Sequence, residues 1–164
     1  MRILGIDPGY GITGFGLIET QRGQNRLLQC GAITTPAGMD FSARLEIIYE
    51  DMKKLLEMAK PDAVAIEELF FGQNVTTGIG VAQARGVVLL AIRQAGLEVY
   101  QYKPMQVKQA LVGYGNATKH QMQDMTKRLL HLNEMPKPDD AADAIAIALC
   151  HARSSTSLIA KALK

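Results

Sequence analysis

Residues 2–16 read RILGIDPGYGITGFG, an apolar run that ends at an acidic residue and is followed by a glycine-rich turn. The run Arg2–Asp7 is typical of a strand, and the Pro-Gly pair after it predicts where the strand ends. Two further stretches rich in strand-forming residues, 11–20 and 26–35, are separated by a polar loop that contains glycine. We therefore expect three strands joined as an antiparallel meander.

The chain beyond the meander alternates predicted helices with predicted strands. From Phe41 to Ala59, apolar residues recur at steps of three and four, which predicts an amphipathic helix. Residues 63–67 form a short apolar segment, again closed by an acid, that is typical of a strand buried on both faces. The other expected elements are a helix over 77–95, a strand over 97–102, a short helix over 107–112, a helix that starts with the capping-box pattern of Thr118 and Gln121, and a last helix over 140–153.

This order of elements predicts the fold class and the domain organisation. Parallel crossovers that follow a meander give an α/β fold with a five-stranded mixed sheet flanked by helices. With 164 residues and 48% apolar content, the chain has the size of one domain with one substantial core. We expect that domain to span residues 1–153, followed by a C-terminal tail, 154–164, that is disordered or forms a short docked helix.

Composition also indicates the cellular setting. We find no run of 18 apolar residues and no N-terminal signal peptide, so we expect a cytoplasmic protein without a membrane span. Cys30 and Cys150 lie in apolar stretches and are predicted to be small buried residues, not a disulfide or a metal pair. His120, His131 and His151 show no ligand spacing, and we expect them at the surface or at helix ends.

The charged residues are unevenly distributed. The net charge of +2 is too small to indicate a polyanionic partner by itself. Residues 101–138, however, hold 6 basic and 2 acidic side chains. This regional basic excess makes that part of the chain the candidate surface for a nucleic acid.

Four acidic residues stand where strands and a helix can bring them together. Asp7 closes the first predicted strand and Glu67 the fourth, while Asp140 and Asp143 lie at i and i+3 of one helix, about 5–6 Å apart at Cβ. Gathered carboxylates cost free energy unless cations neutralise them, and an all-oxygen donor set selects Mg²⁺ or Mn²⁺ over zinc. Each acid alone is equally well explained as a strand-end or helix-cap residue. The combination favours a metal site, because Asp143 interrupts a small apolar segment, 141–149.

A set of short motifs, taken in order, resembles one known family. The motifs are Ile6-Asp7-Pro8-Gly9 with Gly11-Ile12-Thr13-Gly14-Phe15-Gly16, Ala65-Ile66-Glu67-Glu68, Gln83-Ala84-Arg85-Gly86, Gln106-Val107-Lys108-Gln109, and Asp140-Ala141-Ala142-Asp143-Ala144 with Ala146-Ile147-Ala148. Each motif alone is weak, but the ordered set, from residue 2 to about 153, closely resembles the RuvC family of Holliday-junction endonucleases.

The resemblance implies a fold, an activity and a metal. It implies an RNase H-like homodimer that uses four acids and two Mg²⁺ ions per subunit, with Mn²⁺ as a substitute, to cut four-way DNA junctions in recombination and repair. Residue by residue, it assigns metal binding and catalysis to Asp7, Glu67, Asp140 and Asp143. It also implies paired symmetrical nicks on like strands, 5′-phosphate and 3′-hydroxyl ends, and the RuvA and RuvB branch-migration complex as partners.

The resemblance also carries over DNA-contacting residues. Lys108 and Lys119 match family positions near the scissile phosphate, where they would bind DNA and assist catalysis. Phe70 matches an aromatic residue that stacks on or wedges between bases near the crossover. Part of the predicted helix over 77–95, which is rich in small residues, corresponds to the family's dimer contact.

Three other functions are consistent with parts of this pattern. The main alternative is a YqgF-like RNase H-fold nuclease that acts on RNA, because such enzymes share the strand-end Asp-x-Gly opening. An actin-like or sugar-kinase-like nucleotide fold also opens in this way, but 164 residues leave no second lobe to close over ATP. A catalytically inactive junction-binding module is disfavoured because all four acids are present.

Overall fold

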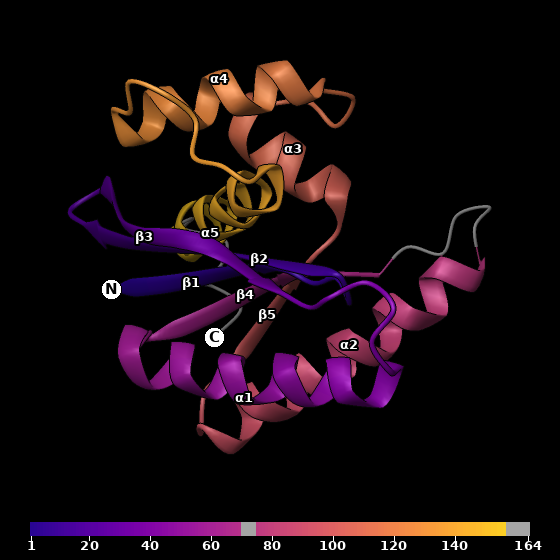
Figure 1. Cartoon of the computed structure of the whole chain (residues 1–164). Coiled ribbons are helices and arrows are strands. Elements are labelled where there is room, and N and C mark those ends of the chain that lie inside the picture. Colours follow the sequence, from indigo (N-terminus) through magenta and orange to yellow (C-terminus); the bar gives the residue numbers. More distant parts are fainter. Residues whose placement is uncertain (70–74, 157–164) are drawn as a thin grey trace.

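A mixed five-stranded sheet forms the centre of the computed structural model, which describes residues 1–69 and 75–156 (Figure 1). Neighbouring strands follow the order β3-β2-β1-β4-β5; β1, β2 and β3 are antiparallel, whereas β4 and β5 run parallel to β1. The predicted meander with parallel crossovers is confirmed. The elements are β1 (Arg2–Asp7), β2 (Ile12–Gln21), β3 (Gln24–Thr34), α1 (Phe41–Ala59), β4 (Ala63–Glu67), α2 (Val75–Gln94), β5 (Val99–Tyr102), α3 (Pro104–Val112), α4 (Lys119–Leu130) and α5 (Asp139–Thr156).

Several element boundaries differ from the sequence-based expectation. Strand β5 begins at Val99 and not at residue 97, because the backbone N–H of Leu97 still donates to the carbonyl of Ile92 at the end of α2. Helix α3 begins at Pro104, since proline is well suited to the first helical position. Helix α5 continues to Thr156, so the expected tail starts inside a helix; residues 157–164 lie outside the described residues.

Local capping fixes the helices that were predicted most clearly. The Asp40 carboxylate accepts hydrogen bonds from the N–H groups of Ser42 and Ala43 at 3.0 and 3.2 Å, and so begins α1. The capping box of α4 is present: Thr118 N–H donates to Gln121 Oε1 at 2.9 Å, and Gln121 N–H donates to Thr118 Oγ1 at 3.3 Å. Both helices therefore begin where their side chains satisfy the first backbone donors.

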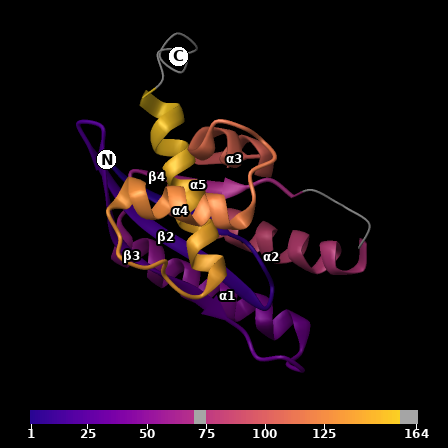
Figure 2. The same cartoon turned by 90° about the horizontal axis from the view of Figure 1, so that it is seen from above.

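The two faces of the sheet carry different residues and different helices. On one face, Leu4 and Ile6 of β1 pack with residues of α1 and α2. On the other face, Ile3 and the residues in step with it lie against α5, with α3 and α4 beyond. Figures 1 and 2 show α1 and α2 below the sheet, and α5 above it with α4 crossing over α5. Because side chains alternate along a strand, Gly5 and Asp7 share the α5 face with Ile3.

Helix α5 lies on the sheet in backbone contact, which glycine makes possible. A Cβ atom built on Gly5 would lie 2.0 Å from the carbonyl oxygen of Ala144, and one built on Gly14 would lie 2.1 Å from the carbonyl oxygen of Asp140. No side chain fits in either space. Gly14 is also the cross-strand partner of Asp7, so this contact seats the first turn of α5 beside Asp7.

The C-terminal half of α5 corrects the prediction for His151 and confirms the one for Cys150. His151 is not at the surface; its side chain is buried, its Nδ1 lies 2.7 Å from the Tyr102 hydroxyl, and its ring centroid lies 4.2 Å from that of Tyr100. The helix covers β5 there, which the sequence spacing alone did not indicate. Cys150 is buried, Cys30 is partly buried, and both are free thiols. Burial raises the pKa of Cys150 to about 11, so this thiol is unreactive at neutral pH.

We expect Gly5→Ala to lower the free energy of unfolding by more than about 2 kcal/mol, because the new methyl group would collide with the backbone of α5. Gly86→Ala is the matched control. Its added Cβ would meet nothing within 4 Å, and alanine favours the helix by up to about 1 kcal/mol. Chemical denaturation of the two variants measures both effects, and equal stabilities would contradict the backbone-contact account.

Candidate functional site

One hollow of about 250 Å³ gathers most of the residues that the sequence singled out. It lies at the carboxyl edge of β1 and β4, beneath the start of α5. Its lining residues are Asp7, Glu67, Pro104, Val107, Lys108, Lys119, Met122, Asp143, Ala146 and Ile147. Asp140 does not line the hollow, yet its charge acts on both Asp7 and Asp143. The structure thus brings together Asp7 and Asp143, which are 136 positions apart.

Strand register explains why Asp7 and Glu67 face the same hollow. Strands β1 and β4 are parallel, and their last aligned pair is Ile6 with Ile66. Asp7 and Glu67 each follow that pair by one residue, so they leave the sheet side by side. Ala65, two residues before Glu67, packs with residues of α5, which places the Glu67 side chain on the same face as Asp7.

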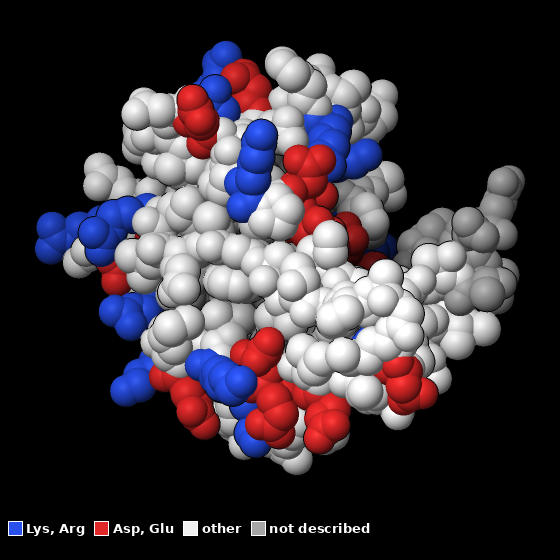
Figure 3. Space-filling view, viewed as in Figure 1, with Lys and Arg blue, Asp and Glu red and all other residues white. Residues whose placement is uncertain are grey.

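Acidic side chains gather in this hollow, and the nearby lysines balance only part of their negative charge. Burial, together with the charges of Glu67, Asp143 and Asp140, raises the pKa of Asp7 to about 7, while Lys119 opposes this shift. The pKa of Glu67 is raised by burial and by Asp143 and lowered by Lys108. In Figure 3, acidic side chains form a column that descends from the upper helical layer into the hollow above the sheet. The negative electrostatic potential of these side chains attracts cations.

Lys119 supplies part of the missing positive charge. It is the first residue of α4, and its Nζ lies 2.8 Å from Asp139 Oδ2 and 3.9 Å from Asp143 Oδ2. The hydrogen bond to Asp139 is the main cause that raises the pKa of Lys119. Its side chain is 53% exposed, and exposed ion pairs stabilise a fold by only about 0–1 kcal/mol. The lysine is therefore free to exchange these partners for others.

The donor set suits a hard divalent cation. The candidate ligands are carboxylates, and carboxylates bind metals through oxygen, which hard cations prefer. Asp7 also has more negatively charged neighbours than positively charged ones. With the side chains as placed, no three Asp, Glu, His or Cys side chains within residues 1–69 and 75–156 meet closely enough to hold an ion. An ion held by these carboxylates would therefore require their side chains to rotate within the hollow.

The turn after Asp7 is held by residues that the sequence analysis did not identify. Arg44 of α1 donates from Nε to Thr35 Oγ1 at 2.8 Å and from Nη2 to the carbonyl oxygen of Tyr10 at 3.2 Å. Thr13 is fully buried and donates from its hydroxyl to the carbonyl oxygen of Gly9 at 2.6 Å. No local pattern indicates the contact between Arg44 and Tyr10, since these residues are 34 positions apart.

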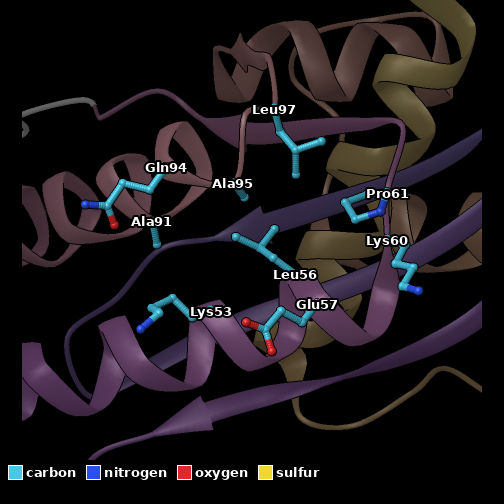
Figure 4. Close-up of a pocket in the computed structure, with 9 residues that line it drawn as sticks. All are labelled: Lys53, Leu56, Glu57, Lys60, Pro61, Ala91, Gln94, Ala95 and Leu97. Carbon is cyan, nitrogen blue, oxygen red and sulfur yellow. The ribbon is translucent and has the colours of Figure 1, made fainter.

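One predicted residue and one further hollow fall outside this site. Phe70 lies outside the described residues, so its predicted contact with DNA stays a prediction. A second hollow, of about 490 Å³, lies between the C-terminal ends of α1 and α2, where Leu56 and Leu97 point toward one another (Figure 4). Although it is larger, its lining holds a single acid, Glu57, and it is on the opposite side of the sheet from Asp7. The smaller hollow carries the candidate chemistry.

Comparisons with known sequences agree on one family. A protein-family model described as "Crossover junction endodeoxyribonuclease RuvC" matches residues 3–151. A relative of that description from Chloroflexus aurantiacus is 53% identical over 158 residues, which is 96% of each chain. Another, from Brevibacillus brevis, is 56% identical over 153 residues, covering 93% of this chain and 92% of the relative.

Solved structures show the same relationship. The structure described as T. thermophilus RuvC in complex with Holliday junction substrate superposes with a TM-score of 0.89 at 39% identity and covers 94% of each chain. A yeast mitochondrial Holliday junction resolvase, 15% identical with a TM-score of 0.68 over 93% of this chain and 79% of that one, shares the fold.

None of the described helices is long and apolar enough to cross a membrane.

We expect Asp7→Asn to stabilise the protein in the absence of divalent cations. The folded state holds the Asp7 proton up to about pH 7 and the unfolded state only to about pH 4, so stability falls as pH rises through this window. Asparagine removes that penalty. The gain, about 1–3 kcal/mol above pH 7, should vanish below pH 4.

Chemical denaturation at pH 8 and pH 4, with a chelator present, measures this gain. Asp124→Asn, which removes a carboxylate on the surface of α4, is the control and should change stability by less than about 0.5 kcal/mol at either pH. A gain in stability of the same size at both pH values would contradict the raised pKa of Asp7 in the folded protein.

Proposed function

The chain belongs to the RuvC family, and on that premise we propose that it is a structure-selective endonuclease that resolves Holliday junctions in DNA recombination and repair. The observation that carries the proposal is the convergence of Asp7, Glu67 and Asp143, from three separate elements, on one hollow beside Lys108 and Lys119. The match to a relative described in complex with Holliday junction substrate supports four-way junction DNA as the ligand.

We propose Mg²⁺ as the metal, two ions per subunit, with Mn²⁺ as a substitute. Asp7, Glu67, Asp140 and Asp143 would hold them, because these carboxylates share one negative region of the surface. When bound, the ions supply activation of a water molecule and stabilisation of the departing 3′ oxygen. The preference of hard ions for oxygen donors supports this choice.

The side chains of the site would have separate roles in the reaction. Asp7 is more enclosed than Glu67 and Asp143 and would hold its ion with less competition from water. Lys119 neutralises the acids of α5 and would turn from Asp139 toward a phosphate when DNA arrives. Lys108 lies beside Glu67 and would grip the neighbouring phosphate. Water attacks phosphorus and the bond to the 3′ oxygen breaks, which leaves 5′-phosphate and 3′-hydroxyl ends.

We propose that the protein acts as a homodimer through α1 and α2. Ile79 and Leu90 of α2 are large apolar residues that are 53% and 52% exposed. Each lies in a shallow hollow that α1 completes, one with Phe41 and the other with Leu45. An exposed apolar stripe of this kind suits a protein partner. In a twofold dimer, two sites related by the symmetry of an open junction would make paired nicks on like strands.

The remaining family properties stay proposals for this chain. Phe70 would stack on or wedge between bases near the crossover. RuvA and RuvB would deliver the junction, and the reaction would take place in the cytoplasm.

A cleavage assay tests the proposed function. With Mg²⁺, wild-type protein should nick a synthetic four-way junction symmetrically on two like strands and leave linear duplex largely uncut. With a chelator, it should bind the junction without cutting it. Preferential cutting of structured RNA would instead support the YqgF-like alternative and contradict junction resolution.

Asp7→Asn and Asp143→Asn should each reduce junction cleavage by at least about 100-fold, because the metal loses a charged ligand. Junction affinity should stay within about threefold of wild type or become tighter, since a negative charge is removed near the phosphates. Asp124→Asn is the control and should cut at the wild-type rate. Loss of binding in parallel with loss of cutting would argue against the metal role.

Leu90→Glu should convert the dimer into a monomer in sedimentation velocity experiments and abolish paired nicking, because the charge falls within the apolar stripe. The matched control is Met58→Glu. Met58 is 60% exposed on α1 but lines neither of the stripe's hollows, so this variant should remain dimeric. A dimeric Leu90→Glu protein would place the interface elsewhere.

A further inference from the structure

Arg85 of α2 connects the helical layer below the sheet to the strand end that carries Glu67. Its Nε donates to the carbonyl oxygen of Glu67 at 3.1 Å. Its Nη2 donates to Oε1 of Gln101 on β5. One guanidinium therefore bonds to the last residue of β4 and to the strand beside it. Arg85 does not line the hollow itself, so it has no place in the proposed contacts with phosphate.

Strand pairing holds the main chain at Glu67 on one side only. The recorded β1 to β4 register stops at Ile66, so Glu67 extends one residue beyond it. On its other side, Glu67 aligns with Tyr102, and the N–H of Glu68 donates to the Tyr102 carbonyl at 2.8 Å. Strand β4 has only five residues. A rotation of this strand end would swing the Glu67 carboxylate within the hollow, and the Arg85 bonds oppose that rotation.

Arginine suits this task because its planar group presents several donors in a fixed arrangement. A side chain with one donor could hold Glu67 or Gln101, but it would not fix their relative positions. The bond from Arg85 to the Glu67 carbonyl is partly buried, so water competes less for it, whereas the bond to Gln101 is exposed. Small displacements matter at such a place, since a misplacement of about 1 Å in a catalytic group can cost roughly 100-fold in rate.

We propose that Arg85 is a positioning residue of the nuclease, which fixes the main chain of Glu67 and so directs its carboxylate toward the metal. The proposal rests on the function proposed above. It assigns Arg85 no contact with DNA, so its loss should affect the chemical step and metal binding more than junction binding.

The test compares Arg85→Met with Arg93→Met. Arg93 is exposed, lies on the same helix, and has no recorded side-chain bond within the described chain. In single-turnover cleavage, Arg85→Met should be about tenfold slower than wild type and should need more Mn²⁺ for half-maximal rate. Its junction dissociation constant should stay within twofold. The rise in melting temperature that Mn²⁺ causes, which needs no DNA, should also shrink. Arg93→Met should match wild type throughout.

Two further variants keep the proposal testable if Arg85→Met folds poorly. Arg85→Lys keeps the charge without the two-donor geometry and should recover less than half of the wild-type rate. Gln101→Leu removes only the side-chain partner and should slow cleavage about threefold with unchanged junction affinity.

The following results would overturn the proposal. They are a cleavage rate and a Mn²⁺ response within twofold of wild type in Arg85→Met or Gln101→Leu, full recovery in Arg85→Lys, or a loss confined to junction affinity. Failure of the proposed function is distinguishable, because it would leave the junction uncut by wild-type protein. In that case the Mn²⁺-induced change in melting temperature would still decide whether Arg85 positions the metal-binding carboxylate.

Discussion

The contact between α5 and the sheet at Gly5 and Gly14 is the constraint on which the site depends. Any side chain at these two positions would intersect the helix backbone, at Ala144 and at Asp140. The resulting close approach sets the first turn of α5 beside Asp7, whose cross-strand partner is Gly14. A helix separated from the sheet by intervening side chains would carry its acids away from the strand ends. The glycines that allow this close packing therefore also determine where the acids of α5 lie.

This arrangement has an energetic cost that the rest of the fold carries. Three carboxylates share a hollow in which burial already disfavours the ionised form of Asp7. Lys119 and Lys108 offset only part of the repulsion, and the Lys119 pair is exposed. Apolar clusters on both faces of the sheet supply the compensating stability. The site is therefore held in an unfavourable electrostatic state by packing elsewhere, which is the condition under which an added cation binds well.

Local patterns in the sequence predicted the scaffold and the acids, but not the contacts that hold them. Strand periodicity placed Asp7 and Glu67 at strand ends, and helical spacing paired Asp140 with Asp143, because these relations extend over only a few residues. The Lys119 pair with Asp139 and the burial of His151 under Tyr102 join residues 20 and 49 positions apart. Such contacts follow from how helices cross the sheet, and no short pattern records that crossing.

The helical layer opposite the site contributes to it through two arginines. Arg44 reaches from α1 to the carbonyl of Tyr10, in the turn that follows Asp7, and Arg85 reaches from α2 to the carbonyl of Glu67. The two strand-borne acids are thus restrained from below the sheet, whereas the acids of α5 are placed from above by the glycine contact. Helices α1 and α2 thus carry both the exposed stripe of Ile79 and Leu90 and the two arginines that reach the strand ends.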